Sequence, residues 1–228
     1  MRQPFGFILG ALVVAAIVIA FLYLPPLLAT GRKLTRLRQW ITDPAAHPEL
    51  AIAAGNRCGR APFVLPTDGY VGFGYGDSFR PGHRHQGLDI FGPTALTQTP
   101  VVAAYDGYLT READWKSAVI IRIPKDPLAP SRQIWTYYAH IADPEGHSFI
   151  LPDFPPGTLE QFVTAGTLLG YQGDYAGDAF NPVSMHLHFS VVQSNPGGGY
   201  KNELDIANTY DPTPYLGLTQ KDGVWKCP

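Results

Sequence analysis

Two histidine motifs carry most of the chemistry that this sequence can support. In segment 185–192 polar and apolar residues alternate as in a strand, so His186 and His188 share one face while Leu187 and Phe189 face the core. Neutral imidazoles placed side by side can share a metal ion, whereas two protonated rings would repel each other. The alternative is an exposed polar strand face, because an isolated pair with this spacing is only moderately specific.

The second motif places a histidine and a carboxylate four residues apart, at His85 and Asp89. In an extended segment these two side chains again share a face, and Gly87 between them has no side chain that could block a metal. His83 competes with His85 for this role, and the carboxylate at position 89 favours His85. A polar loop beside a turn is the alternative.

Together, His85, Asp89 and one histidine of the pair His186 and His188 provide three nitrogen and oxygen ligands. This set is typical of catalytic zinc, which keeps its fourth position for water. Zinc lowers the pKa of bound water to about 7 and polarises a carbonyl. The remaining histidines could then serve as general acid–base groups or stabilise an oxyanion. Spacing alone does not decide which histidine of the pair binds the metal.

The elements that position these motifs are strands and turns rather than helices. Glycine and proline, with 24 and 22 residues of 228, make up about a fifth of the chain, and both disfavour helices. Strand candidates cover 118–123, 134–141, 168–171 and 186–192, and two more at 101–105 and 108–110 flank Asp106-Gly107, which predicts a hairpin. Prolines between 142 and 160 predict a long loop. The expected fold class is mainly β, with a small antiparallel sheet.

The N-terminal segment differs from the rest of the chain in charge and hydropathy. Residues 1–40 carry five basic residues and no acidic one, so the remainder is acidic, which argues against nucleic acid as a partner. The apolar run 5–24 would span about 30 Å as a helix, the thickness of a bilayer core, and two prolines follow it. We expect an uncleaved transmembrane anchor; a cleaved signal peptide, which would leave a secreted protein, is the alternative.

We expect three parts in the chain: an anchor over residues 1–30, a juxtamembrane amphipathic helix and linker over 31–57, and one domain over 58–228. The two cysteines, Cys58 and Cys227, stand near the ends of that domain and suit a disulfide in an extracytoplasmic compartment. Basic residues after the anchor would favour a cytoplasmic domain instead, although long domains translocate largely regardless of charge. We expect the domain to face outward.

The sequence resembles the LytM/lysostaphin-type zinc metallopeptidases, the M23 peptidase family, over residues 66–192. The matching motifs follow one another in order: Gly72–Gly76, His85–Ile90, Thr99–Ala104, Asp106-Gly107, Tyr138–Ile141, Gly166–Gly170 and His186–Phe189. The resemblance implies that His85, Asp89 and His188 bind one Zn²⁺ ion per chain. It implies catalytic roles for His140 and His186, which would position or deprotonate the water and stabilise the transition state. The implied fold is a small antiparallel β-sheet with a groove bordered by loops.

The substrates implied by this resemblance are the peptide cross-links and stem peptides of bacterial peptidoglycan. The chain would then be a single-pass bacterial membrane protein that hydrolyses these peptides outside the cytoplasm, by attack of a zinc-bound water. The sequence departs from the family pattern at 142–160 and at 174–182, and we expect both segments to form groove walls. Two alternatives are a wall-binding or regulatory module that does not cut, and a zinc peptidase for a protein substrate.

Overall fold

The computed structural model describes residues 31–78, 82–180 and 182–228. The apolar run at 5–24, which we expect to be a membrane anchor, lies outside these ranges. Within them, no helix combines the length and the apolar character that crossing a membrane requires. A helix covers residues 31–42, and the other helical turns are η1 (Pro44–Ala46), η2 (Pro48–Leu50), η3 (Ile206–Asn208) and α2 (Thr213–Leu216).

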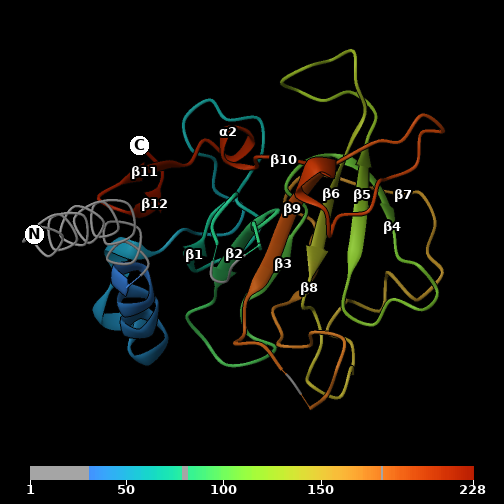
Figure 1. Cartoon of the computed structure of the whole chain (residues 1–228). Helices are drawn as coiled ribbons and strands as arrows, with labels where there is room; N and C mark the ends of the chain where they lie inside the picture. The colour runs from blue at the N-terminus through green and yellow to red at the C-terminus, as the bar shows by residue number, and fades with distance from the viewer. Residues whose placement is uncertain (1–30, 79–81, 181) are drawn as a thin grey trace, which may run out of the picture.

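One antiparallel sheet of eight strands forms the centre of the molecule (Figure 1). Its strands in spatial order are β1 (Tyr70–Phe73), β2 (Leu88–Phe91), β9 (Leu187–Gln193), β6 (Ile134–Ala139), β5 (Val119–Ile123), β4 (Gly107–Thr110) and β7 (Gln161–Val163), and β10 (Thr209–Tyr210) also pairs with β9. Two small antiparallel pairs accompany it, β3 (Pro100–Val102) with β8 (Leu168–Tyr171) and β11 (Thr219–Lys221) with β12 (Val224–Lys226). The expectation of a mainly β, antiparallel fold is confirmed.

The two faces of the central sheet have different environments. Alternate residues of β9, namely Leu187, Phe189 and Val191, lie in the main hydrophobic core, which continues into β3 and β8. Successive side chains of a strand point to opposite faces, so His188 lies on the other side of the sheet. Asp89 reaches that same face from β2, because Leu88 and Ile90 on either side of it lie in the core. The polar residues of both motifs therefore gather on one face.

The hairpin expected at Asp106-Gly107 does not form, and that prediction is wrong. Strand β3 pairs with β8, whereas β4 pairs with β5 and β7. Gly107 lacks the positive φ of a type I′ turn and lies in a ladder, where a Cβ would come 2.5 Å from the Arg122 carbonyl oxygen. The Asp106 carboxylate accepts a hydrogen bond from the Ala165 N–H at 2.7 Å. Contacts with distant strands override the turn preference of this dipeptide.

Residues 31–57, which the sequence presents as a juxtamembrane helix and linker, pack against the rest of the chain. Trp40, in the helix over 31–42, lies in an apolar cluster with Phe91 of β2. Its Nε1–H donates to the Phe91 carbonyl oxygen at 2.8 Å. Further along, Ile52 joins the main core and bridges to the residue before β1. These contacts hold the helix, drawn in blue, beside β1 (Figure 1).

A disulfide joins the two ends of the expected domain. The Cα atoms of Cys58 and Cys227 lie 5.0 Å apart, and the two residues are separated by 169 positions in the sequence. Cys58 is buried in the main core, whereas Cys227 is exposed. The central sheet therefore lies within one covalent loop.

Candidate metal centre

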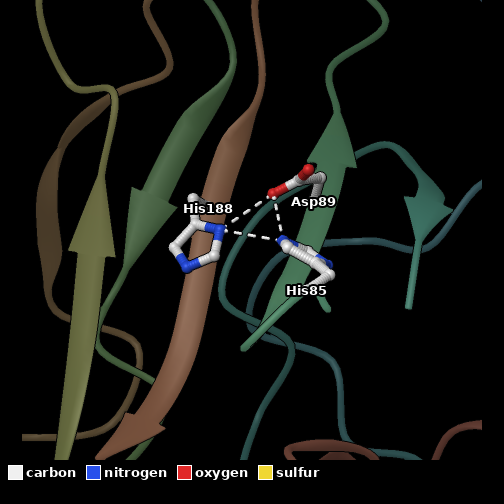
Figure 2. A group of neighbouring side chains, drawn as sticks. All are labelled: His85, Asp89 and His188. Carbon is white, nitrogen blue, oxygen red and sulfur yellow. Dashed lines mark hydrogen bonds and ion pairs between the residues drawn. The ribbon is translucent and has the colours of Figure 1, made fainter. Parts of the chain in front are cut away.

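Three ligand atoms from the two sequence motifs converge on one point, as Figure 2 shows. Asp89 Oδ1 lies 3.0 Å from His85 Nε2 and 2.9 Å from His188 Nδ1. The two nitrogens are themselves 3.1 Å apart. All three residues are buried. Among the described residues they form a compact group of possible metal ligands, and His83, the alternative to His85, is not a member of this group.

The sheet register brings these residues together. Asp89 of β2 stands directly opposite His188 of β9, and cross-strand partners on one face have neighbouring side chains. His85 lies just before β2, where its N–H donates to the Asp77 carbonyl oxygen at 2.8 Å. Gly87 permits the close approach, because a Cβ there would come 2.4 Å from the Phe189 carbonyl oxygen and 2.9 Å from His188 Cε1. A glycine is therefore required between the two ligands.

Hydrogen bonds at the outer nitrogens set the tautomers of both histidines. His85 Nδ1–H donates to the Gly74 carbonyl oxygen at 3.1 Å, which leaves the Nε2 lone pair facing the site. His188 Nε2–H donates to a Glu203 carboxylate oxygen at 2.7 Å, which leaves Nδ1 facing the site. Metal-binding histidines typically donate their second N–H to a carbonyl or carboxylate in this way. In its neutral form, each histidine thus presents one lone pair to the same point.

The donor set fits zinc. In a tetrahedral zinc site with bonds of about 2.0–2.2 Å, neighbouring ligand atoms are roughly 3.3–3.6 Å apart. The three atoms here are only slightly closer, at 2.9–3.1 Å, so a small outward shift of the side chains accommodates one ion. Two imidazoles and a carboxylate leave one tetrahedral position open, which is the arrangement of catalytic rather than structural zinc.

Neighbouring charges shift the pKa values of Asp89 and His188 in opposite directions. Burial alone would raise the pKa of Asp89, but contacts with His186, His188 and His85 hold it well below its usual range, so the carboxylate is ionised. Burial alone would lower the pKa of His188, but the carboxylates of Glu203 and Asp89 raise it to about 10 in the metal-free protein. A cation at this point therefore competes with a proton on His188.

Two further histidines, His140 and His186, border the ligand group. Their ring centroids are 4.5 Å apart, and His186 Nε2 lies 3.5 Å from Asp89 Oδ1. His140 Nδ1–H donates to the Tyr175 carbonyl oxygen at 2.7 Å, and His186 Nδ1–H donates to the Ser184 carbonyl oxygen at 2.6 Å. In its neutral form each ring therefore carries its lone pair on Nε2.

His140 is held in an unusual state. Its φ of 67° lies in the left-handed region that non-glycine residues rarely adopt, and such strain clusters at functional sites. Burial is the main cause that lowers the pKa of His140 to about 3, and the electrostatic effect of the neighbouring His186 ring adds to it. The imidazole is therefore neutral near pH 7 in the metal-free protein, and its lone pair is on Nε2.

A cavity of about 410 Å³ opens beside these residues. Its walls include His140 and His188, so a substrate in the cavity would touch one candidate ligand and one of the two histidines that border the ligand group. Residues 175–177, from the segment that we expected to form a groove wall, line the cavity as well. Residues 142–160, which carried the same expectation, do not line this cavity.

Sequence reasoning missed two side chains of this site, Glu203 and Gln86. Glu203 accepts hydrogen bonds from His188 and from the Gln86 side chain, whose Nε2–H donates at 3.1 Å. Gln86 stands inside the motif that begins at His85, but no chemical role was inferred for it. Glu203 lies in an irregular stretch after β9 with no periodicity or motif around it, so the sequence offers no signal that would find it.

Comparisons with known proteins give matches among solved structures alone. No protein-family model matches the sequence, and no curated protein matches it. The catalytic domain of the antimicrobial peptidase lysostaphin from Staphylococcus simulans is similar, with 21% identity, a TM-score of 0.41, and coverage of 64% of this chain and 90% of that one.

Two other similar solved structures are described as M23 proteins. A variant catalytic domain of the prophage-encoded M23 protein EnpA from Enterococcus faecalis has 19% identity and a TM-score of 0.39, over 64% of this chain and 93% of that one. A putative peptidase M23 from Pseudomonas aeruginosa has 19% identity and a TM-score of 0.41, over 82% of this chain and 63% of that one. At these identities and TM-scores, we base the functional proposal on the residues of this chain.

Proposed function

We propose that this chain is a zinc metalloendopeptidase of the LytM/lysostaphin type, in the M23 family, that hydrolyses peptide bonds in the cross-links or stem peptides of bacterial peptidoglycan. The observation that carries the proposal is the convergence of His85 Nε2, Asp89 Oδ1 and His188 Nδ1 within 3.1 Å of one another. The resemblance of the sequence motifs to that family supplies the substrate class.

The chain's own residues account for the remaining requirements of peptide hydrolysis. Zinc bound by His85, Asp89 and His188 would supply a Lewis acid that polarises the scissile carbonyl and lowers the pKa of water. In their neutral forms, His140 and His186 each carry a lone pair on Nε2 at the edge of the ligand group, where it can accept a proton from the attacking water. The same imidazole, once protonated, can pass that proton to the leaving amine, as general acid–base catalysis requires.

These two histidines also favour an enzyme over a wall-binding module. A module that only holds zinc or wall material needs the three ligands, but it has no use for two more imidazoles beside them. Here, the ligand set is accompanied by His140 in a strained backbone conformation with a neutral ring, which supports a catalytic role.

We further propose that residues 5–24 anchor the chain in the bacterial membrane and that the catalytic domain lies outside the cytoplasm. The disulfide between Cys58 and Cys227 supports an oxidising compartment. The helix over 31–42 adds support, because its outer face exposes Leu34 and Ile41, at 48% and 50% exposure, as an interfacial helix would.

The test combines metal analysis with digestion of purified peptidoglycan. We expect about one zinc per chain, and release of soluble peptides by the wild-type protein. His186→Ala should keep its zinc and lose digestion by about 10²–10⁴-fold, the usual contribution of a general acid–base residue. His147→Ala is the matched control, because this histidine is exposed, pairs with Asp143, and belongs neither to the group of His85, Asp89 and His188 nor to the cavity lining. Zinc-loaded protein that leaves every wall preparation intact would contradict the proposal.

A further inference from the structure

A carboxylate with little solvent exposure lies against the outer nitrogen of one candidate ligand. Glu203 Oε1 is 2.7 Å from His188 Nε2, and the two side chains are 11% and 8% exposed. The Gln86 amide donates to the same oxygen at 3.1 Å, so the carboxylate is itself held in place. Acidic side chains are rarely buried unless they are paired, and here the partner is the ligand histidine.

We propose that Glu203 is a positioning residue, whose carboxylate holds His188 in the tautomer and ring orientation that present Nδ1 to zinc. This inference rests on the proposed function for the identity of the metal. A neutral imidazole has one N–H and one lone pair, so the nitrogen that donates to Glu203 forces the lone pair onto the nitrogen that faces Asp89. The 2.7 Å contact also fixes the rotation of the ring.

The two ligand histidines differ in how they are held. His85 donates to a neutral backbone carbonyl at 3.1 Å, whereas His188 donates to a charged carboxylate at 2.7 Å. A carboxylate on the outer nitrogen increases the basicity of the inner one and therefore strengthens its bond to a metal. We assign Glu203 to the metal centre for this reason, although its side chain also borders the cavity.

The experiment measures zinc affinity of the full-length chain by competition with a chromophoric chelator, without any substrate. Glu203→Ala should bind zinc about 10- to 100-fold more weakly than wild type, the usual cost of losing such a partner. Glu203→Gln should lose less, because its amide oxygen can still accept the Nε2–H. Glu160→Gln is the matched control: it removes the same charge from a glutamate that pairs with Arg122 away from the site, and its affinity should be unchanged.

A second readout reports the hydrogen bond directly. Nitrogen NMR of the zinc-loaded wild type should show the His188 proton on Nε2 and slow exchange of that proton with water, because Glu203 accepts its hydrogen bond. In Glu203→Ala the same proton should exchange faster, because it has lost its acceptor. Should Glu203→Ala fail to fold without metal, the milder Glu203→Gln tests the inference by the same two measurements, zinc affinity and nitrogen NMR.

Three results would overturn the inference. One is zinc affinity in the Glu203 variants within about twofold of wild type; a second is an equal loss in Glu160→Gln. The third is a rise in KM for a wall peptide with zinc affinity unchanged, which would mean that Glu203 contacts substrate instead. A wild-type chain that binds zinc but does not cut peptidoglycan would overturn the proposed function, while leaving the affinity comparison intact.

Discussion

Loss of the disulfide should destabilise the domain strongly, and the substitution Cys227→Ala tests this cleanly. Cys227 is exposed, so removing its side chain creates no cavity, whereas Cys58 is buried in the main core. The change in stability therefore reports the cross-link itself. A separation of 169 residues between the two cysteines makes the closed loop long.

The expected magnitude follows from the entropy that the cross-link removes from the unfolded chain. For a loop of 169 residues, this entropy corresponds to about 5 kcal/mol at 25 °C. In a chain of this size, each kcal/mol shifts the melting temperature by roughly 2–4 °C. We therefore expect Cys227→Ala to melt about 10–20 °C below the oxidised wild type.

The assay is thermal unfolding followed by circular dichroism, with oxidised wild type, reduced wild type and Cys227→Ala side by side. Reduced wild type is the control and should match the variant, because both lack only the cross-link. A fall in melting temperature of less than about 4 °C in both samples would refute the reasoning, since it would equal about 1 kcal/mol.

Two further predictions concern the metal centre. In the metal-free protein, the pKa of His188 is raised to about 10, above the value of about 6.5 in the unfolded chain, so folding favours the protonated form. This stabilisation is complete below about pH 6.5 and is lost as the pH rises towards 10; urea unfolding across that range should show the decline, and a flat profile would contradict it. Gly87→Ala should destabilise the protein by about 1–3 kcal/mol and weaken zinc binding, because its Cβ would meet the Phe189 carbonyl oxygen and the His188 ring. Chemical unfolding and chelator competition measure both effects. Gly31→Ala is the control, because a Cβ at Gly31 meets no other described residue within 4 Å; equal effects in the two variants would be contrary to expectation.

Alternation of polar and apolar residues explains how far the fold could be predicted. In β9 the apolar residues Leu187, Phe189 and Val191 lie in the core as their spacing predicts, and strand β5 falls inside the expected segment 118–123. The hairpin at Asp106-Gly107 could not be rejected from the sequence, because β3 pairs with β8 far along the chain, while β4 pairs with β5 and β7. Local turn chemistry does not contain that information.

Some residues of the candidate site could likewise be predicted from the sequence, and others could not. The pairing of His85 with Asp89 could be inferred, since four residues of extended chain place both on one face. Spacing could not assign His186 and His188, because residues two apart share a face, and it is the three-dimensional arrangement that places His188 Nδ1 2.9 Å from Asp89. Glu203 could not be predicted as a site residue from the sequence, since its contact with His188 depends on the path of an irregular segment after β9.

The most direct test of the central claim is mass spectrometry of cross-linked muropeptides after incubation with the zinc-loaded, full-length chain in water enriched in heavy oxygen. Hydrolysis of a peptide bond should give two fragments, of which the one with the new carboxyl group carries one heavy oxygen and the one with the new amino group carries none. Zinc-loaded His186→Ala should give almost no labelled fragment. Intact muropeptides after incubation with the zinc-loaded wild type, or equal cleavage by His186→Ala, would contradict the account.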